Sequence, residues 1–299
     1  MEPVALRPLS FGEVLDTSFN LFKRNFKSVV IISAVIMVPL SLLGAAAAAG
    51  IAPSDLSALG DPEASLEEVL SLLGGLYGAL GVGAVLQWFG STLVQAATTR
   101  IYAESYRGVT VELGDAMRHG LRRLPAMLGL VFLSSLGTGL GLLACFLPGI
   151  WLYGAWATAP AALIAEDIGP IRALGRSFQL VKQHWWRVFG LLVLSTILVT
   201  IISSVVTGPL QFGAMFGGGF ANPEAAFDGG FLALSTLLNG LVTAITLPFV
   251  AAVVVAIYFD LRVRKEGFDL DRLIEDLGPA PTQAGSLEEP DRHDPFGLG

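Results

Sequence analysis

Hydrophobic and polar positions follow one recurring pattern: a short stretch with apolar residues at helical spacing leads into a long run without charge. The clearest copy covers residues 166–206. Ile171 and Leu174 begin its apolar face, and Trp185 and Trp186 precede the uncharged run. Because basic amphipathic helices and tryptophans favour the membrane–water boundary, this pattern predicts a helix on the membrane surface followed by a membrane span.

Six apolar runs approach or exceed the length of a membrane span, since about 20 helical residues cover the ~30 Å hydrocarbon layer. Composition agrees, because only 14% of the 299 residues are charged, against about 25% in soluble domains. Leu147-Pro148-Gly149 predicts a tight turn that makes the third and fourth spans a hairpin. The predicted spans are residues 28–50, 69–99, 124–146, 150–165, 188–207 and 231–259.

Three amphipathic helices are predicted, at residues 10–26, 111–124 and 169–185. Each precedes two spans, and all three units point the same way, so the repeat is parallel. The predicted fold is an all-α integral membrane protein. It has about six transmembrane helices and three cytoplasmic interfacial amphipathic helices, arranged as three parallel helix–span–span repeats.

Composition divides the chain into four parts. Ser10 and Glu13 form a capping box at the first helix, and Ser65 and Glu68 repeat it before the second span. The tail is rich in proline, glycine and acids, which predicts disorder. The parts are a cytoplasmic amphipathic helix (1–27), a polytopic membrane domain (28–260), a cytoplasmic basic segment with a short helix (261–277) and a disordered tail (278–299).

Lysine and arginine are confined to short blocks, although the net charge is −7. Outside the tail, every block lies at a terminus or between an even span and the next odd span. The loops at 51–68 and 208–230 contain acids and no base. The positive-inside rule therefore predicts a multi-pass protein of the cytoplasmic membrane, with both termini and all three amphipathic helices in the cytoplasm.

Chemistry-bearing motifs are scarce. The sequence has no Walker A, H-E-x-x-H or G-x-S-x-G motif, and its one cysteine, Cys145, lies in an apolar run. The three histidines, His119, His184 and His293, are scattered over two surface helices and the tail. We therefore expect no cofactor, no metal and no catalytic site.

One constellation of charges stands out near the predicted cytoplasmic face. An acid ends the second span of each repeat, where it opposes the helix dipole and favours a cationic partner. The acids could meet in an ion-pair ring around a pseudo-three-fold axis, or form separate pairs that fix the elbows between surface helices and spans. The candidate cluster comprises Glu104, Glu166 and Asp260 with Arg176, Arg187, Arg262 and Arg264.

The basic faces of the amphipathic helices predict contact with membrane lipids, in particular anionic headgroups. Basic helices also occur in nucleic-acid-binding proteins, but lipid phosphates explain these with fewer assumptions, so no nucleic acid is expected. The candidate headgroup contacts are Lys23, Arg24, Lys27, Arg118, Arg122, Arg123, Arg172, Lys182, Trp185 and Trp186.

The predicted spans carry few polar side chains. The absence of central charges argues against a proton-coupled pump, and Gln87, Gln95 and Asn239 are interpreted as inter-helix hydrogen-bonding residues. Gly74 and Gly78 are four residues apart, a spacing that predicts close helix packing.

Three stretches resemble a known family: RPLSFGEVLDTSFNLFKRNF at 7–26, AEDIGPIRALGRSFQLVKQHWWRVFG at 165–190 and IYFDLRVRKEGFDL at 257–270. They look like the membrane-domain family named after glycerophosphoryl diester phosphodiesterases. The resemblance covers nearly the whole chain except the tail. That membrane domain is sometimes fused to a soluble phosphodiesterase domain, which this sequence does not contain. The resemblance therefore implies a membrane domain and gives no basis for an enzyme assignment.

Two functions remain open. The first is a non-enzymatic membrane protein that serves as an accessory or scaffold in lipid or envelope processes, with protein partners unknown. The alternative is a transporter or lipid-handling permease, which the parallel repeats and the helix prolines Pro39, Pro160 and Pro248 favour.

Overall fold

The computed structural model describes residues 8–49, 65–214 and 229–276, and these residues are helical with short connections and no strand. Five helical segments in the described part are long and apolar enough to cross a membrane. The predicted all-α integral membrane fold is therefore confirmed. The helices are α1 Phe11–Ala49, α3 Leu66–Tyr106, α4 Leu113–Ala144, α5 Phe146–Ala155, α6 Ala159–Ala165, α7 Pro170–Val181, α8 Trp185–Ala214 and α9 Gly229–Asp276.

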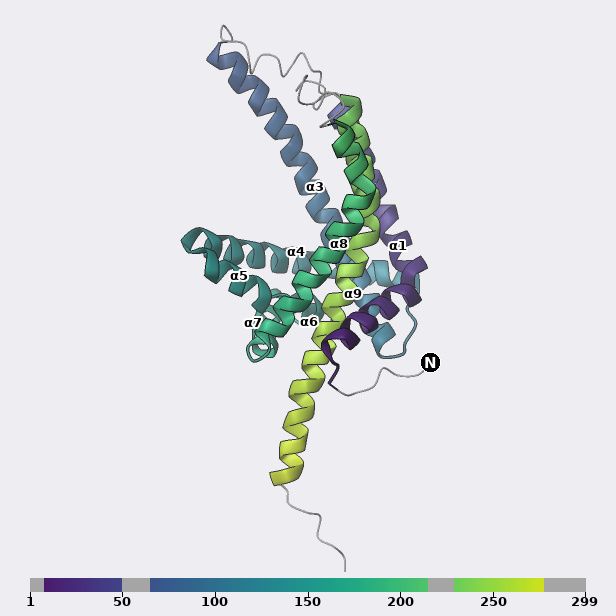
Figure 1. The fold of residues 1–299 in the computed structure, drawn as a ribbon, viewed down its shortest axis with the longest axis vertical. Helices are drawn as coiled ribbons and strands as arrows, with labels where there is room; N and C mark the ends of the chain where they lie inside the picture. Colours follow the sequence, from purple (N-terminus) through teal and green to yellow (C-terminus); the bar gives the residue numbers. More distant parts are fainter. Residues whose placement is uncertain (1–7, 50–64, 215–228, 277–299) are drawn as a thin grey trace, which may run out of the picture.

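The helices radiate from one packed region. Parts of α1, α3, α8 and α9 rise from it in one general direction, and the α4–α5 hairpin leaves it crosswise (Figure 1). We call the rising parts the arms: residues 33–49, 66–93, 193–214 and 229–250. The packed region, which we call the junction, comprises residues 9–32, 94–123, 155–192 and 251–266.

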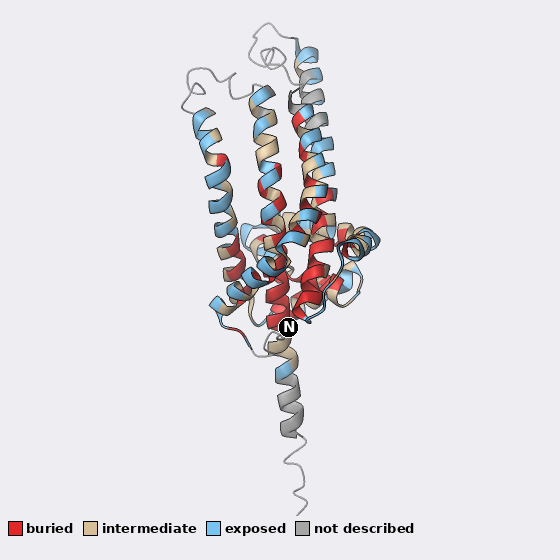
Figure 2. Cartoon of the chain, turned by 90° about the vertical axis from the view of Figure 1, so that its right-hand side faces the viewer, coloured by how far each residue is buried: buried red, intermediate tan, exposed pale blue. Residues whose placement is uncertain are grey.

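The junction holds most of the buried side chains, as Figure 2 shows. Tyr102, Tyr258 and Leu180 are almost completely buried in its main apolar cluster. Tyr106 stacks on Phe259, with ring centroids 4.3 Å apart and planes within 6°. A buried leucine or aromatic side chain contributes about 1.5–3 kcal/mol relative to an exposed one, so the junction is the stable centre of the fold.

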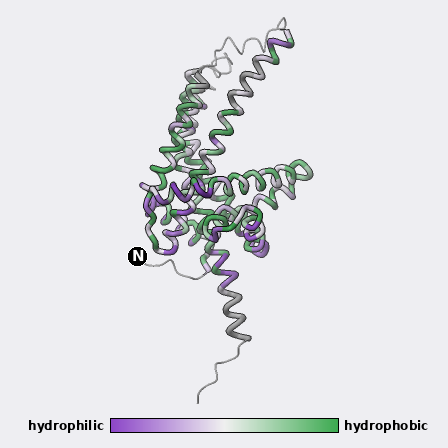
Figure 3. Tube along the Cα trace, turned by 180° about the vertical axis from the view of Figure 1, so that it is seen from behind, coloured by the Kyte–Doolittle hydropathy of each residue, from purple (hydrophilic) through white to green (hydrophobic). Residues whose placement is uncertain are grey.

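The arms and the hairpin expose large apolar side chains instead. Leu143 at the hairpin tip is 86% exposed, and Val205 on α8 is 71% exposed. Figure 3 shows hydrophobic positions along both regions and hydrophilic positions around the junction. Apolar surfaces this large are not stable in water, whereas lipid chains solvate them as well as a protein core does.

Several elements that the sequence predicts as separate form single helices. The first amphipathic helix and the first span are both part of α1, and the second amphipathic helix and the third span are both part of α4. Likewise α9 continues beyond the sixth span to Asp276 and so includes almost all of the basic segment with a short helix predicted at 261–277. Neither glycine nor proline interrupts the chain at residues 26–28 or 259–266, so nothing ends these helices there.

The predicted fourth span is broken. Residues 146–165 form α5, with ten residues, and α6, with seven, separated by a turn at 156–158. Ser177 of α7 covers the break, because its hydroxyl donates to the carbonyl of Ala155 at 2.8 Å and lies 2.9 Å from the Thr158 hydroxyl. At ~1.5 Å per residue, α5 is about 15 Å long, half of the hydrocarbon layer.

The hairpin turn lies at Cys145, so its predicted place at residues 147–149 is wrong. Cys145 is extended (φ −169°, ψ 134°), and Pro148 lies in the first turn of α5, where its missing N–H is tolerated. The limbs are in backbone contact, since a Cβ on Gly149 would lie 2.6 Å from the Leu142 nitrogen. A Cβ on Gly74 or Gly78, in contrast, would meet no described atom within 4 Å, so the close packing predicted there is not made with another described helix of this chain.

The predictions for the helix starts, the second span and the outward loops have different outcomes. Both capping boxes are confirmed: the Ser10 N–H donates to Glu13 at 2.6 Å, and Ser65 and Glu68 cap α3 reciprocally. The predicted second span lies within α3, which has 41 residues. Residues 208–214, predicted as loop, continue α8. The remainder of both outward loops, at 50–64 and 215–228, and the tail from 277 lie outside the described residues.

Candidate functional site

A buried carboxylate on α9 binds three parts of the junction. The side chain of Asp260 is 1% exposed and lies 3.1 Å from Arg187 of α8 and 3.0 Å from Arg264, one turn further along α9. It also accepts the backbone N–H of Leu9 at 2.8 Å. The Leu9 carbonyl in turn accepts from both arginines. The segment before α1 is therefore joined to the start of α8 and to the part of α9 in the junction.

A second cluster connects α6, α7 and α9. The Glu166 carboxylate accepts from Arg176 Nε at 2.8 Å and from the Tyr258 hydroxyl at 2.7 Å. Arg176 also pairs with Glu266, and Glu266 accepts from Arg262 at 2.6 Å. Two carboxylates beside one guanidinium make Arg176 the centre of this cluster. Although partial burial opposes the charge, the hydrogen bonds from Arg176 to both acids raise its pKa.

Glu104 lies apart from these two clusters. Its partners are Arg100 at 2.9 Å and Arg107 at 3.6 Å, both in or directly after the same helix. Among the described residues, no ion pair joins the three acids Glu104, Glu166 and Asp260 to one another through a shared base. A single ring is therefore wrong. The physical reason is spacing: arginines three or four residues away are nearer to Glu104 than any base of another helix.

Other members of these clusters were absent from the sequence-based set. Arg100, Arg107 and Glu266 lie three or four residues from an opposite charge, so helical spacing alone could have identified them. Tyr258 and Asp167 have no such signal. Asp167 is in the left-handed region, with φ 57°, and pairs with Arg123 of α4. That contact exists only because α4 crosses the turn between α6 and α7.

The predicted headgroup contacts are distributed over the outside of the junction. Lys23, Arg24 and Lys27 are exposed on α1, Arg118 and Arg122 on α4, and Arg172 and Lys182 on or beside α7. Trp186 is 80% exposed, whereas Trp185 stacks on Phe189 and donates to the Trp151 carbonyl at 2.9 Å. Arg123 pairs with Asp167 and its side chain is 20% exposed, so it is less available to a headgroup than the exposed bases.

Histidine chemistry finds little support in this arrangement. His184 lies in the turn between α7 and α8, where burial and the nearby charges of Arg264 and Arg187 lower its pKa. His119 lies on α4, and His293 lies outside the described residues. The described part contains no group of three or more histidine, cysteine or acidic side chains that could hold a metal ion. The chemical features of the junction are therefore its exposed cations and the two ion-pair clusters around Asp260 and Glu166.

Comparisons with known proteins agree with a membrane protein. Residues 125–261 match the model of a family described as a domain of unknown function (DUF7847). The chain is similar to the UPF0259 membrane protein SG1383 of Sodalis glossinidius (strain morsitans), with 26% identity over 183 residues that cover 58% of this chain and 73% of the relative. No solved structure matches. The chain thus resembles bacterial membrane proteins of uncharacterised function, and the matches support neither the phosphodiesterase membrane-domain family nor any enzyme family.

Proposed function

We propose that this protein is a non-enzymatic accessory protein of the cytoplasmic membrane that gathers anionic lipids at its cytoplasmic side. One observation carries the proposal: the exposed bases all surround the junction, and the arms contain no lysine or arginine. The positive-inside rule then places the junction and both termini in the cytoplasm. The Asp260 and Glu166 clusters hold the helices that present these bases in fixed positions.

The arms and the hairpin take different positions relative to the membrane in the proposed arrangement. The arms cross the bilayer, since the 22 residues of the α8 arm cover about 33 Å. The hairpin runs crosswise to the arms, and α5 is too short to cross (Figure 1). We therefore place the hairpin within the cytoplasmic leaflet, parallel to the membrane plane, beside the bases of α4 and α7.

The resemblance to the phosphodiesterase membrane-domain family agrees with a role near lipids, but it adds no activity. A permease is the second candidate. Its supporting observation is that α3 leans away from α8 and α9 toward its outer end (Figure 1). The accessory role has broader support. A permease without central charges has no evident need for the exposed bases or for the ion-pair clusters around Asp260 and Glu166.

Quenching of the protein's tryptophans by brominated lipids tests the proposal. The purified full chain is reconstituted in mixtures of brominated phosphatidylglycerol with phosphatidylcholine, and in the converse mixtures. We expect stronger quenching by the anionic lipid. Changing Lys23, Lys27 and Arg118 together to Gln should remove much of this preference, because each base near an anionic surface contributes about 1 kcal/mol, screened by salt.

Glu67→Gln, at the far end of α3, serves as the control variant and should leave the preference intact. Equal quenching by both lipids in the wild-type protein would refute the proposal. So would phosphodiesterase activity of the pure protein that a single substitution abolishes.

A further inference from the structure

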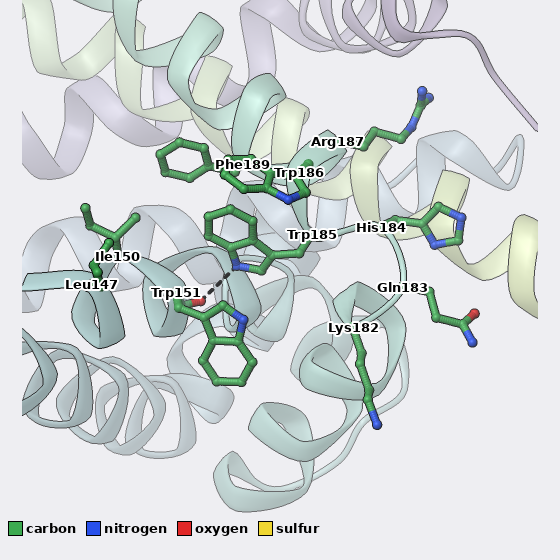
Figure 4. A pocket seen from close by; sticks show the side chains of 10 residues that line it. All are labelled: Leu147, Ile150, Trp151, Lys182, Gln183, His184, Trp185, Trp186, Arg187 and Phe189. Carbon is green, nitrogen blue, oxygen red and sulfur yellow. Dashed lines mark hydrogen bonds between the residues drawn. The ribbon is translucent and has the colours of Figure 1, made fainter.

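A groove of about 810 Å³ lies between the start of α5, the turn after α7 and the first turns of α8 (Figure 4). Its volume is in the range of about 300–1,000 Å³ that is typical of ligand sites. Leu147, Ile150 and Phe189 line one end, and Lys182 and His184 line the other. The groove is therefore amphipathic along its length.

Specific side-chain contacts hold the apolar end of the groove in place. The indole of Trp185 stacks on Phe189 with centroids 4.9 Å apart, and its N–H donates to the Trp151 carbonyl. The same ring lies against the backbone of α5, because a Cβ on Gly154 would come within 2.7 Å of Trp185 Nε1. These contacts fix the wall of the groove, which continues into the exposed apolar tip of the hairpin at Phe146.

The basic end has one cation to offer. Arg187 is engaged by Asp260 and the Leu9 carbonyl. Lys182 is exposed, and its ammonium has no partner among the described residues. His184 also lines this end, but Figure 4 shows its ring and the Lys182 side chain extending in different directions, so Lys182 alone offers a cation to an anion there. An anion at this end would gain a partner without breaking the Asp260 cluster.

We propose that this groove binds one molecule of an anionic diacyl phospholipid. Its phosphate lies at Lys182, and one acyl chain lies along Leu147, Ile150 and Phe189. The combination of a cation with a contiguous apolar wall fits a lipid, whereas a soluble phosphate would leave the wall exposed to water. The inference rests on the proposed function only for the cytoplasmic placement of the junction.

Native mass spectrometry of the delipidated full-length protein in detergent tests this site. Phosphatidylglycerol, phosphatidylcholine and glycerol phosphate are added in separate titrations. We expect one phosphatidylglycerol per chain to bind more tightly than phosphatidylcholine by at least tenfold, and glycerol phosphate not to bind measurably. Lys182→Gln should lower the phosphatidylglycerol affinity at least fivefold and leave the phosphatidylcholine affinity unchanged.

Arg172→Gln, an exposed base on α7 that does not line the groove, is the matched control and should retain the single-site affinity. Gly154→Ala tests the apolar end independently, because it displaces the Trp185 ring; it should weaken binding of both lipids. Unchanged phosphatidylglycerol affinity in the Lys182→Gln variant, or glycerol phosphate binding as tightly as the lipid, would overturn the assignment. A failure here that leaves the tryptophan-quenching preference intact contradicts the groove alone and not the wider lipid role.

Discussion

The α4–α5 hairpin and the α8–α9 pair have the same sequence pattern, two long uncharged runs after a basic amphipathic stretch, yet they leave the junction in different directions (Figure 1). The α8 helix has 30 residues and α9 has 48, whereas α5 has ten. Fourteen residues separate α8 from α9, and Cys145 alone separates α4 from α5. Hydropathy therefore identifies both pairs as membrane segments, while helix length and turn length decide how each lies.

The two pairs are also held differently. The α8–α9 pair is joined at its base by the buried charges of Arg187 and Asp260. The hairpin is held by backbone contact at Gly149 and by the Trp185 indole on α5. Removing a charge should therefore destabilise the α8–α9 pair. Adding side-chain volume should instead destabilise the α4–α5 hairpin.

Removing the Asp260 charge should have the largest effect. Asp260→Asn leaves Arg187 and Arg264 without their carboxylate in a buried site, at an expected cost of about 3–5 kcal/mol in the free energy of unfolding. Unfolding in mixed detergent micelles, followed by tryptophan fluorescence, measures it. Asp115→Asn, exposed in the first turn of α4, should cost at most about 1 kcal/mol. Equal losses would mean that the Asp260 cluster is not what joins α8 to α9.

Glu166→Gln should come next. It weakens the bonds from Arg176 and Tyr258, which connect the elbow after α6 to α9, and hydrogen bonds to charged groups contribute about 1.5–3 kcal/mol. Glu67→Gln at the exposed start of α3 provides the reference. A double-mutant cycle with Tyr258→Phe should show coupling. Strict additivity would leave Glu166 as an ordinary surface carboxylate.

Gly149→Ala should open the hairpin, because the new methyl group meets the α4 backbone; overpacking of this kind costs about 1–3 kcal/mol. The matched change Gly139→Ala has nothing within 4 Å and should be neutral or stabilising by up to about 1 kcal/mol. The thermal midpoints of the two variants in detergent provide the comparison. If both shift alike, backbone contact does not hold the hairpin.

The smallest effect concerns pH. Burial, followed by the nearby charges of Arg264 and Arg187, keeps the pKa of His184 below its usual 6.5, with Asp260 opposing them. His184 is therefore neutral at pH 7, and it destabilises the fold as pH falls below 6.5, since the folded protein disfavours the protonated ring. The free energy of unfolding in mixed detergent micelles should thus fall slightly as pH drops below 6.5, and His184→Gln should remove this part of the pH dependence.

Much of the fold follows from the sequence because its causes are local. Capping boxes at Ser10 and Ser65, uncharged runs and helical spacing predict where helices begin and which of them contact lipid. The pairing of Glu104 with Arg100 follows from the same spacing. These features depend on residues within a turn or two of one another.

The rest depends on contacts between distant segments. The break at residues 156–158 is marked in the sequence only by Gly154 before it and by Pro160 in the first turn of α6, and it is covered by Ser177 from another helix. Because of that break, the fourth predicted span becomes two short helices and the hairpin turns aside. Tyr258 and Asp167 join the candidate site for the same reason, through helix crossings that no local pattern encodes.

The depth profile of the hairpin tests the central claim most directly. Single cysteines in a Cys145→Ser background carry a bimane label at the exposed positions Phe132, Leu136, Leu140 and Leu143 of α4, and at Ile197, Ile201 and Val205 of α8. Quenching by nitroxides at known lipid depths then locates each label. We predict a depth that changes by about 12 Å between residues 197 and 205, at ~1.5 Å per residue, and a nearly constant depth along α4. A slope along α4 equal to that of α8 would show an upright, membrane-crossing hairpin and contradict the account.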